Sequence, residues 1–279
     1  MNLKISHLLS ATLFSLFLFS SANAEEVAGK QWPANKQTSI DKIDHKPFDT
    51  LLQKYVDKDG LVNYKAWHAS QEDRATLTTY LETLSCVDPN AKAERNAKLA
   101  FWINAYNAVT IEGILRVYPT TSIRNHTAKV VGYNIWKDLY LYVGNTKINL
   151  NDIEHEVLRK MSEPRIHFAI VCASIGCPRL YNNAYVADKL ETQLTTNTTD
   201  FFSRSQNLQV DAQRSKLNLS EIMNWFGTDF GATQAQQIQA IAPYFPENAK
   251  TFVGSRRYSI GFLSYDWNLN TQKYSLQSI

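Results

Sequence analysis

Apolar residues recur at helical spacing along much of the chain, which predicts a mostly helical protein. In residues 47–56, for example, Phe48, Leu51, Leu52 and Tyr55 fall on one face of a helix, and the acidic and glycine residues of 57–60 end it. The same pattern predicts further helices over residues 65–85, 93–118, 151–161, 185–204, 220–225 and 234–244.

The predicted helix over residues 93–118 is apolar on most of its sides, which indicates that it is buried. Asn104 and Asn107 project onto an apolar sector of this helix. A buried amide without a partner would cost about 1–3 kcal/mol, so both side chains must form hydrogen bonds. They either bind the backbone of a neighbouring loop or line a polar pocket, where they would orient a ligand or a catalytic group.

Extended segments are fewer and shorter. Residues 139–143 and 146–150, joined by Gly144 and Asn145, have the pattern of a β-hairpin with a tight turn. Residues 217–219 and 258–265 also have strand character. The expected fold class is therefore α+β, a mostly helical single domain with a small antiparallel sheet.

The first residues have the pattern of a secretory signal peptide. Lys4 precedes an apolar run over residues 8–19, and Ala22 and Ala24 form a small-x-small cleavage pattern. We expect a signal peptide at residues 1–24 and a periplasmic or secreted protein without stable membrane insertion after cleavage. Residues 25–45 are polar and aperiodic and are predicted to form a flexible N-terminal tether, so that the domain spans residues 46–279.

Charge and composition narrow the partners. The chain has 29 Lys and Arg against 26 Asp and Glu, a formal net charge of +3, which is too small to favour nucleic acid. No cofactor is implied, and the expected partner is an unidentified small molecule or peptide. Three cysteines in an oxidising compartment allow at most one internal disulfide, and Cys172 and Cys177 are close enough in sequence to form it.

Residues 165–178, RIHFAIVCASIGCP, place a histidine, two cysteines and a serine in an otherwise apolar run. Residues 166–172 are predicted to form a buried strand. Because side chains alternate along a strand, His167 and Cys172 would lie on opposite faces. A base for Cys172 would then come from elsewhere, and His155 is the nearest candidate.

His155 belongs to the predicted helix that begins at Asn151. Glu154 projects close to the middle of the buried stripe of this helix, and His155 lies on its flank. Glu154 either completes a capping box with Asn151 or forms an acid/base pair with His155, and both interpretations stand.

Several motifs in order resemble those of one known family. They are FWINAYN (residues 101–107), IEH (153–155), RIHFAIVCASIGCP (165–178), residues 219–231 and YDWNLN (265–270). Together they are similar to the family catalogued as domain of unknown function 547. The resemblance implies an exported bacterial domain with relatives in plants, and it leaves the biochemical activity undefined.

The preferred hypothesis is a thiol-dependent hydrolase or acyl-transfer enzyme with Cys172 as its nucleophile. His155 or His167 would act as the base, and Glu154, Asp266 or an asparagine would orient it. These polar groups lie on elements that are expected to pack together, which is the pattern of a ligand site.

Two alternatives stand beside this hypothesis. In the first, the protein is a non-catalytic binding module in which Asn104 and Asn107 grip a small ligand or a protein and a Cys172–Cys177 disulfide shapes the loop. In the second, His155, His167 and the two cysteines hold a metal ion, although their spacing matches no known zinc or iron motif.

Overall fold

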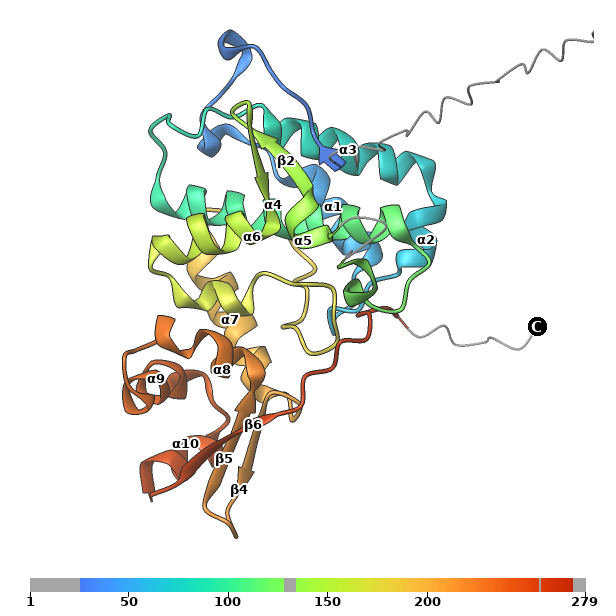
Figure 1. The fold of residues 1–279 in the computed structure, drawn as a ribbon. Helices are drawn as coiled ribbons and strands as arrows, with labels where there is room; N and C mark the ends of the chain where they lie inside the picture. The colour runs from blue at the N-terminus through green and yellow to red at the C-terminus, as the bar shows by residue number, and fades with distance from the viewer. Residues whose placement is uncertain (1–25, 128–133, 256, 273–279) are drawn as a thin grey trace, which may run out of the picture.

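The computed structural model describes residues 26–127, 134–255 and 257–272 (Figure 1). The predicted signal peptide, residues 1–24, lies outside the described residues. The described chain folds as the predicted α+β domain, with helices in the majority and two small sheets. None of its helices is both long and apolar enough to cross a bilayer.

The α-helices are α1 (Lys46–Tyr55), α2 (Tyr64–Ala69), α3 (Gln71–Ser85), α4 (Arg95–Val117), α5 (Ile135–Asp138), α6 (Leu150–Asp152), α7 (Leu190–Ser203), α8 (Glu221–Phe226), α9 (Gln234–Ile241) and α10 (Glu247–Ser255). Short 3-10 turns connect them: η1 (Ala34–Lys36), η2 (Ile40–Lys42), η3 (Ile123–His126), η5 (Arg159–Met161), η6 (Pro164–Phe168), η7 (Gly227–Asp229) and η8 (Ala242–Tyr244). One turn, η4 (Ile153–Leu158), is a π-helix that continues directly from α6.

Each sheet has three strands and is mixed, whereas the sequence predicted an antiparallel sheet. β2 (Leu139–Val143) and β3 (Thr146–Asn149) form the predicted hairpin, and β1 (Glu26–Ala28) adds to β2 in parallel. In the second sheet, β4 (Leu208–Asp211) pairs with β5 (Lys216–Ser220) in antiparallel, and β6 (Ser259–Leu263) pairs with β5 in parallel. The parallel pairs join segments that are distant in sequence, so no turn motif in the sequence predicts them.

The predicted flexible tether is wrong for residues 26–45, because this segment packs on the domain. Its first residues form β1, and Ala28 and Ile40 are buried. The indole Nε1 of Trp32 donates a hydrogen bond of 2.9 Å to the carbonyl oxygen of Glu82 on α3. Pairing and burial of a few apolar residues thus hold a segment whose composition is mostly polar.

The predicted helix over residues 65–85 is two helices, α2 and α3. Ser70 has an extended backbone between them, and its hydroxyl accepts a hydrogen bond from the backbone nitrogen of Asp73. A serine in this position caps the second helix and lets the chain change direction.

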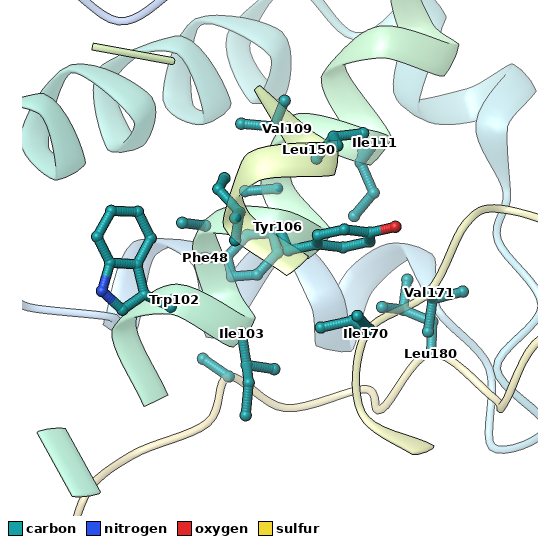
Figure 2. Close-up of a cluster of buried hydrophobic side chains, with 14 of the residues drawn as sticks. Phe48, Trp102, Ile103, Tyr106, Val109, Ile111, Leu150, Ile170, Val171 and Leu180 are labelled. Atoms are coloured by element: carbon teal, nitrogen blue, oxygen red, sulfur yellow. The ribbon is translucent and has the colours of Figure 1, made fainter. Parts of the chain in front are cut away.

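Two apolar clusters make up the core. The larger one gathers around α4, whose residues from Leu99 to Leu115 are all buried. Figure 2 shows part of it, with Trp102, Ile103 and Tyr106 of α4 gathered with Leu150, Ile170 and Val171. The smaller cluster surrounds the second sheet and α8 to α10, which occupy the lower part of Figure 1. Tyr265 packs against both clusters.

Residues 166–172 do not form the predicted strand. The segment begins with the 3-10 turn η6 and continues without regular structure, and residues 166–171 are all buried. Asparagine side chains satisfy its backbone: Asn107 accepts from Val171 and donates to Ala169, and Asn197 donates to Phe168. Because side chains form the hydrogen bonds of its backbone groups, this buried segment does not require a partner strand.

Candidate functional site

A cavity of about 190 Å³ opens where the two apolar clusters meet. Its polar lining comes from side chains of the sequence motifs: Tyr106, Glu154, His167, Cys172, Cys177 and Tyr265. The rest of its lining is apolar or aromatic: Trp136, Ile170, Pro178, Ile222, Trp225, Phe226 and Trp267. His167 and Cys172 thus face the same cavity. The prediction that they lie on opposite faces is wrong because the segment between them is not a strand.

A tight turn brings the two cysteines together. The backbone nitrogen of Cys177 donates to the carbonyl oxygen of Ser174, and Ala173 has a left-handed φ of 59°. The backbone nitrogen of Cys172 lies 3.0 Å from Sγ of Cys177 and donates to it. Both cysteines are free thiols in the structure, so the disulfide of the binding-module hypothesis is not formed here.

Two hydroxyl groups are shared by the two sulfurs. Tyr265 Oη lies 3.3 Å from Sγ of Cys172 and 3.1 Å from Sγ of Cys177. The corresponding distances from Ser174 Oγ are 3.2 Å and 3.4 Å, and the two hydroxyl oxygens are 2.9 Å apart. Atoms that contact the same oxygen are near neighbours, so the two thiols and two hydroxyls form one cluster.

This cluster favours a thiolate on Cys177. Burial alone would raise the pKa of Cys177, but hydrogen bonds from Cys172, Ser174 and Tyr265 outweigh it and lower the pKa. The pKa of Cys172 is raised, because its hydrogen bond to Cys177 keeps its proton in place and because it is buried. The sequence placed the nucleophile at Cys172, whereas these contacts favour Cys177 as the charged sulfur.

The chain reaches the site a second time through residues 265–270, which run beside the cysteine turn. Ile175 and Gly176 donate backbone hydrogen bonds of 2.8 Å to the carbonyl oxygens of Asn268 and Asp266. A Cβ atom on Gly176 would lie 2.8 Å from Cδ2 of Tyr265, so only glycine lets the tyrosine ring pack this closely. These contacts fix the Tyr265 hydroxyl between the sulfurs.

Glu154 lines the cavity from the π-helical turn η4. Turns of this kind are rare and concentrate at functional sites. The Tyr106 hydroxyl donates a hydrogen bond of 3.3 Å to Oε2 of Glu154. Burial raises the pKa of Glu154 to about 7, so its carboxyl group can both donate and accept a proton near neutral pH.

His167 is held by a carboxylate and by an aromatic ring. Its Nε2 lies 2.8 Å from Oδ2 of Asp229, and its ring stacks on Phe226 with a centroid distance of 4.2 Å. Arg159 binds the same carboxylate in a bidentate manner, with two distances of 2.7 Å. Burial lowers the pKa of His167 to about 4, so the imidazole is neutral at pH 7.

The remaining predicted site residues lie outside the cavity lining. His155 has its Nδ1 atom 3.1 Å from Nη1 of Arg159, which makes it an acceptor within the Arg159 and Asp229 network. Asp266 is exposed, and its carboxylate accepts hydrogen bonds from Asn268. Neither residue contacts a sulfur through any hydrogen bond found in the described residues.

Asn104 and Asn107 support the site from behind. Both are buried and each exchanges two hydrogen bonds with a loop backbone, Asn104 with Tyr185 and Asn107 with Ala169 and Val171. These contacts match the loop-backbone interpretation of the sequence. Asn107 thereby fixes the segment that leads into Cys172.

Aromatic rings form the outer wall of the cavity. Tyr265 packs against Trp225 and Trp267, with centroid distances of 4.9 Å and 4.5 Å, and the two tryptophan rings stack on each other at 5.9 Å. Trp225 remains 45% exposed, which is unusual for so large an apolar side chain. No lysine or arginine belongs to the lining of this cavity as far as the chain is described. The wall therefore suits an uncharged or apolar group.

The metal hypothesis finds no support in this geometry. Within residues 26–127, 134–255 and 257–272, no three His, Cys, Asp or Glu side chains are arranged to hold a metal ion. His155 and His167 face Arg159 and Asp229, respectively, while the cysteines bind hydroxyl groups.

Sequence reasoning missed several residues that complete the site: Tyr106, Ser174, Trp225, Asp229, Tyr265 and Trp267. All of them lie in motifs that the sequence analysis singled out. In YDWNLN, the charged Asp266 was the predicted site residue, but the aromatic residues on either side of it, Tyr265 and Trp267, line the cavity. The sequence signal that could have predicted four of these residues is the concentration of Tyr and Trp in the motifs.

Fold and site together define an α+β domain with a pair of neighbouring thiols, one buried and one partly buried, in the cavity between its two apolar clusters. Residues 90–202 match the family model described as protein of unknown function DUF547, and the chain carries a domain of this family. The matched region contains the cysteine turn, Glu154 and His167, whereas Trp225 and Tyr265 lie beyond it. No curated protein and no solved structure matches the chain.

Proposed function

We propose that this protein is a thiol-dependent enzyme of the hydrolase or acyl-transfer class, acting on small uncharged acyl groups. The observation that carries the proposal is the set of hydrogen bonds on Cys177 Sγ, which favours a thiolate in a cavity that also contains Glu154. A thiolate is the nucleophilic form of cysteine.

In the proposed reaction, the Cys177 thiolate attacks the carbonyl carbon of the acyl substrate. Glu154, in its protonated form, donates a proton to the leaving group as the acyl-enzyme forms. The resulting carboxylate then takes a proton from water or from an acceptor alcohol or amine, which attacks the thioester and releases Cys177. A pKa of about 7 supports both roles of Glu154 near neutral pH.

His167 is the second candidate for proton transfer. It lines the same cavity, it is neutral at pH 7, and Asp229 fixes its orientation. The variants E154Q and H167N separate the two candidates. Replacing the residue that transfers the proton should alter the pH dependence of turnover, and replacing the other residue should not.

The size and lining of the cavity support the choice of substrate class. Its volume is about 190 Å³, and an apolar cavity of about 150 Å³ accommodates benzene. A short acyl chain or a single ring fits these dimensions. A carboxylate or phosphate on this group would meet Glu154 without a compensating cation in the lining.

The test is turnover of short-chain nitrophenyl esters and thioesters, compared between uncharged acyl groups and the corresponding dicarboxylic half-esters. We expect turnover of the uncharged substrates and a covalent acyl adduct on Cys177, both absent in C177S. C86S is the matched control, because the Cys86 thiol bonds the carbonyl oxygen of Lys36 and is outside the cavity lining. Absence of both turnover and adduct in the reduced wild-type protein would contradict the proposal.

A binding module without catalysis is the second candidate, favoured by the exposed Trp225 beside Tyr265 and Trp267. It predicts that small uncharged amides quench tryptophan fluorescence in the wild type and much less in W225A. Binding by the wild type without any acyl adduct would favour this candidate over the enzyme.

Export belongs to the same proposal, since the pattern of residues 1–24 is its support. N-terminal sequencing of the protein from the periplasm or the medium should begin at Glu25. A chain that keeps its first residues in the cytoplasm would contradict export.

A further inference from the structure

The site contains one thiol more than acyl transfer requires. A single thiolate suffices for nucleophilic catalysis, yet Cys172 and Cys177 both line the cavity and share the hydroxyls of Tyr265 and Ser174. Cys86, in contrast, lies outside the cavity lining. The second cavity thiol therefore needs its own explanation.

The geometry of the turn places the second thiol where it can meet the first. Sγ of Cys177 lies only 3.0 Å from the backbone nitrogen of Cys172, and both sulfurs lie within 3.3 Å of Tyr265 Oη. Residues 266–270 hold the turn through backbone hydrogen bonds. Asn270 donates to the carbonyl oxygen of Ala173, and the carbonyl oxygens of Asn268 and Asp266 accept from Ile175 and Gly176. The sulfurs are thus close neighbours on a fixed backbone, which is the requirement for a disulfide without large movement.

We propose that Cys172 and Cys177 form a reversible dithiol–disulfide couple that exchanges with small, uncharged disulfide substrates in this cavity. This thiol–disulfide exchange is an activity beyond the proposed acyl chemistry, and it does not depend on it. The substrate disulfide is itself the oxidant, so no further co-reactant is needed.

The exchange proceeds in two displacements. The Cys177 thiolate attacks one sulfur of the substrate R–S–S–R′, the substrate S–S bond breaks, and a mixed disulfide Cys177–S–S–R forms while R′–S⁻ leaves and takes up a proton. Cys172 then loses its proton and attacks Sγ of Cys177, which releases R–S⁻ and closes the Cys172–Cys177 disulfide. In sum, the protein gives two electrons to the substrate, Cys172 gives one proton and the solvent gives the second, and the substrate leaves as R–SH and R′–SH.

The polar contacts favour the reduced form of the couple, so the two displacements are favoured in reverse, with the Cys172–Cys177 disulfide oxidising small thiols. The backbone nitrogen of Cys172 and the Tyr265 hydroxyl stabilise the reduced form by donating to Cys177. A disulfide loses these charge-assisted hydrogen bonds. Stabilisation of the reduced form makes a couple more oxidising, so the disulfide should be readily reduced by ordinary thiols. A structural disulfide would resist such reduction.

The test equilibrates the purified wild-type protein in mixtures of 2-mercaptoethanol and its disulfide, which are small and uncharged, and follows the loss of two hydrogen atoms at residues 172 and 177 by peptide mass mapping. We expect full oxidation in the disulfide reagent, full reduction in 2-mercaptoethanol, and the same midpoint from both directions. Failure to form the Cys172–Cys177 disulfide in the disulfide reagent would overturn the proposal. So would a disulfide that persists in 2-mercaptoethanol, because it would be a structural disulfide.

A trapping experiment checks the order of the two displacements. In a C86S background, C172S should accumulate a mixed disulfide with a small aromatic disulfide at Cys177, whereas the parent with both cavity cysteines should release the product thiol. A parent that retains the mixed disulfide as long as C172S does would contradict Cys172 as the resolving thiol. The 2-mercaptoethanol titration needs no cavity variant, and it can fail or succeed independently of ester turnover.

Discussion

Tyr265 donates a hydrogen bond of 3.1 Å to Sγ of Cys177, across 88 residues of sequence. The tyrosine comes from the segment after β6, and the cysteine comes from the turn after η6, so the contact joins the two apolar clusters of the core. The charge state of the candidate nucleophile, Cys177, therefore depends on the correct packing of the two apolar clusters against each other.

Replacing Tyr265 by phenylalanine should raise the pKa of Cys177. A hydrogen bond to a charged group contributes about 1.5–3 kcal/mol, which corresponds to roughly 1–2 pKa units. The fraction of thiolate near neutral pH falls accordingly, and alkylation of Cys177 by iodoacetamide should slow by about tenfold. The pH dependence of the labelling rate, followed by peptide mass mapping, measures the change.

Tyr185 offers the matched control for this variant. Its ring is buried in the same core, and its hydroxyl finds no hydrogen-bond partner among the described residues. Y185F should therefore leave the labelling of Cys177 unchanged. Equal labelling rates in Y265F and Y185F would contradict the role assigned to the Tyr265 hydroxyl.

Glu154 should link stability to pH. Burial raises its pKa from 4.5 to about 7, so the folded protein favours the neutral carboxyl group. This contribution is fully present below about pH 4.5 and is lost as the pH rises through about 7, by up to about 3 kcal/mol. The free energy of unfolding of E154Q, measured in urea from pH 4.5 to 8, should lack this loss.

Glu156 provides the control, since it lies on the same turn but is exposed and pairs with Lys160. E156Q should keep the wild-type pH dependence over this window. Parallel stability curves for wild type and E154Q would show that Glu154 titrates at an ordinary pKa.

His167 should remain neutral well below the ordinary pKa of histidine. Its pKa is lowered from 6.5 to about 4, mainly by burial. Stability should consequently fall as the pH drops from about 6.5 towards 4, because the unfolded chain binds the proton first. The imidazole resonances of His167 should move near pH 4 in the folded protein and near 6.5 in urea. A midpoint near 6.5 in the folded protein would contradict its buried, neutral state.

Asn107 should be a strong determinant of stability although it does not line the cavity. In N107A, the backbone groups of Ala169 and Val171 lose their partners inside the core, at a cost of about 2–4 kcal/mol. N125A is the surface comparison, since the Asn125 side chain is exposed and donates to the Thr121 hydroxyl, and it should change stability by no more than about 0.5 kcal/mol. Similar urea midpoints for the two variants would contradict the stabilising role of the hydrogen bonds from Asn107 to Ala169 and Val171.

The helices and the hairpin could be predicted because their signals are local. Apolar spacing indicated α1 and α4 within a residue or two, and Gly144 with Asn145 indicated the turn between β2 and β3. The parallel pairings of β1 and β6 depend on contacts between distant segments, which no local pattern encodes. The same holds for residues 26–45, whose few apolar side chains bury against the domain.

The sequence could predict which elements form the site, but it could not predict how their side chains are arranged. The sequence brought Glu154, His167 and the cysteines into one region, and all of them line the cavity. The strand predicted for residues 166–172 gave the wrong orientation for His167, because Asn107 and Asn197 satisfy the backbone there in place of a partner strand. Tyr265 could not be predicted as a site residue, because the role of its hydroxyl depends on contacts with two cysteines that are distant in sequence.

The most direct test of the account is the pH titration of thiolate ultraviolet absorbance in reduced C86S, with C86S/C177S as reference. One thiolate per molecule should form below the ordinary cysteine pKa in C86S, and it should disappear in C86S/C177S. A C86S titration that shows no thiolate until the ordinary cysteine range, or a low-pH thiolate that survives in C86S/C177S, would contradict the claim that Cys177 is the charged sulfur of this site.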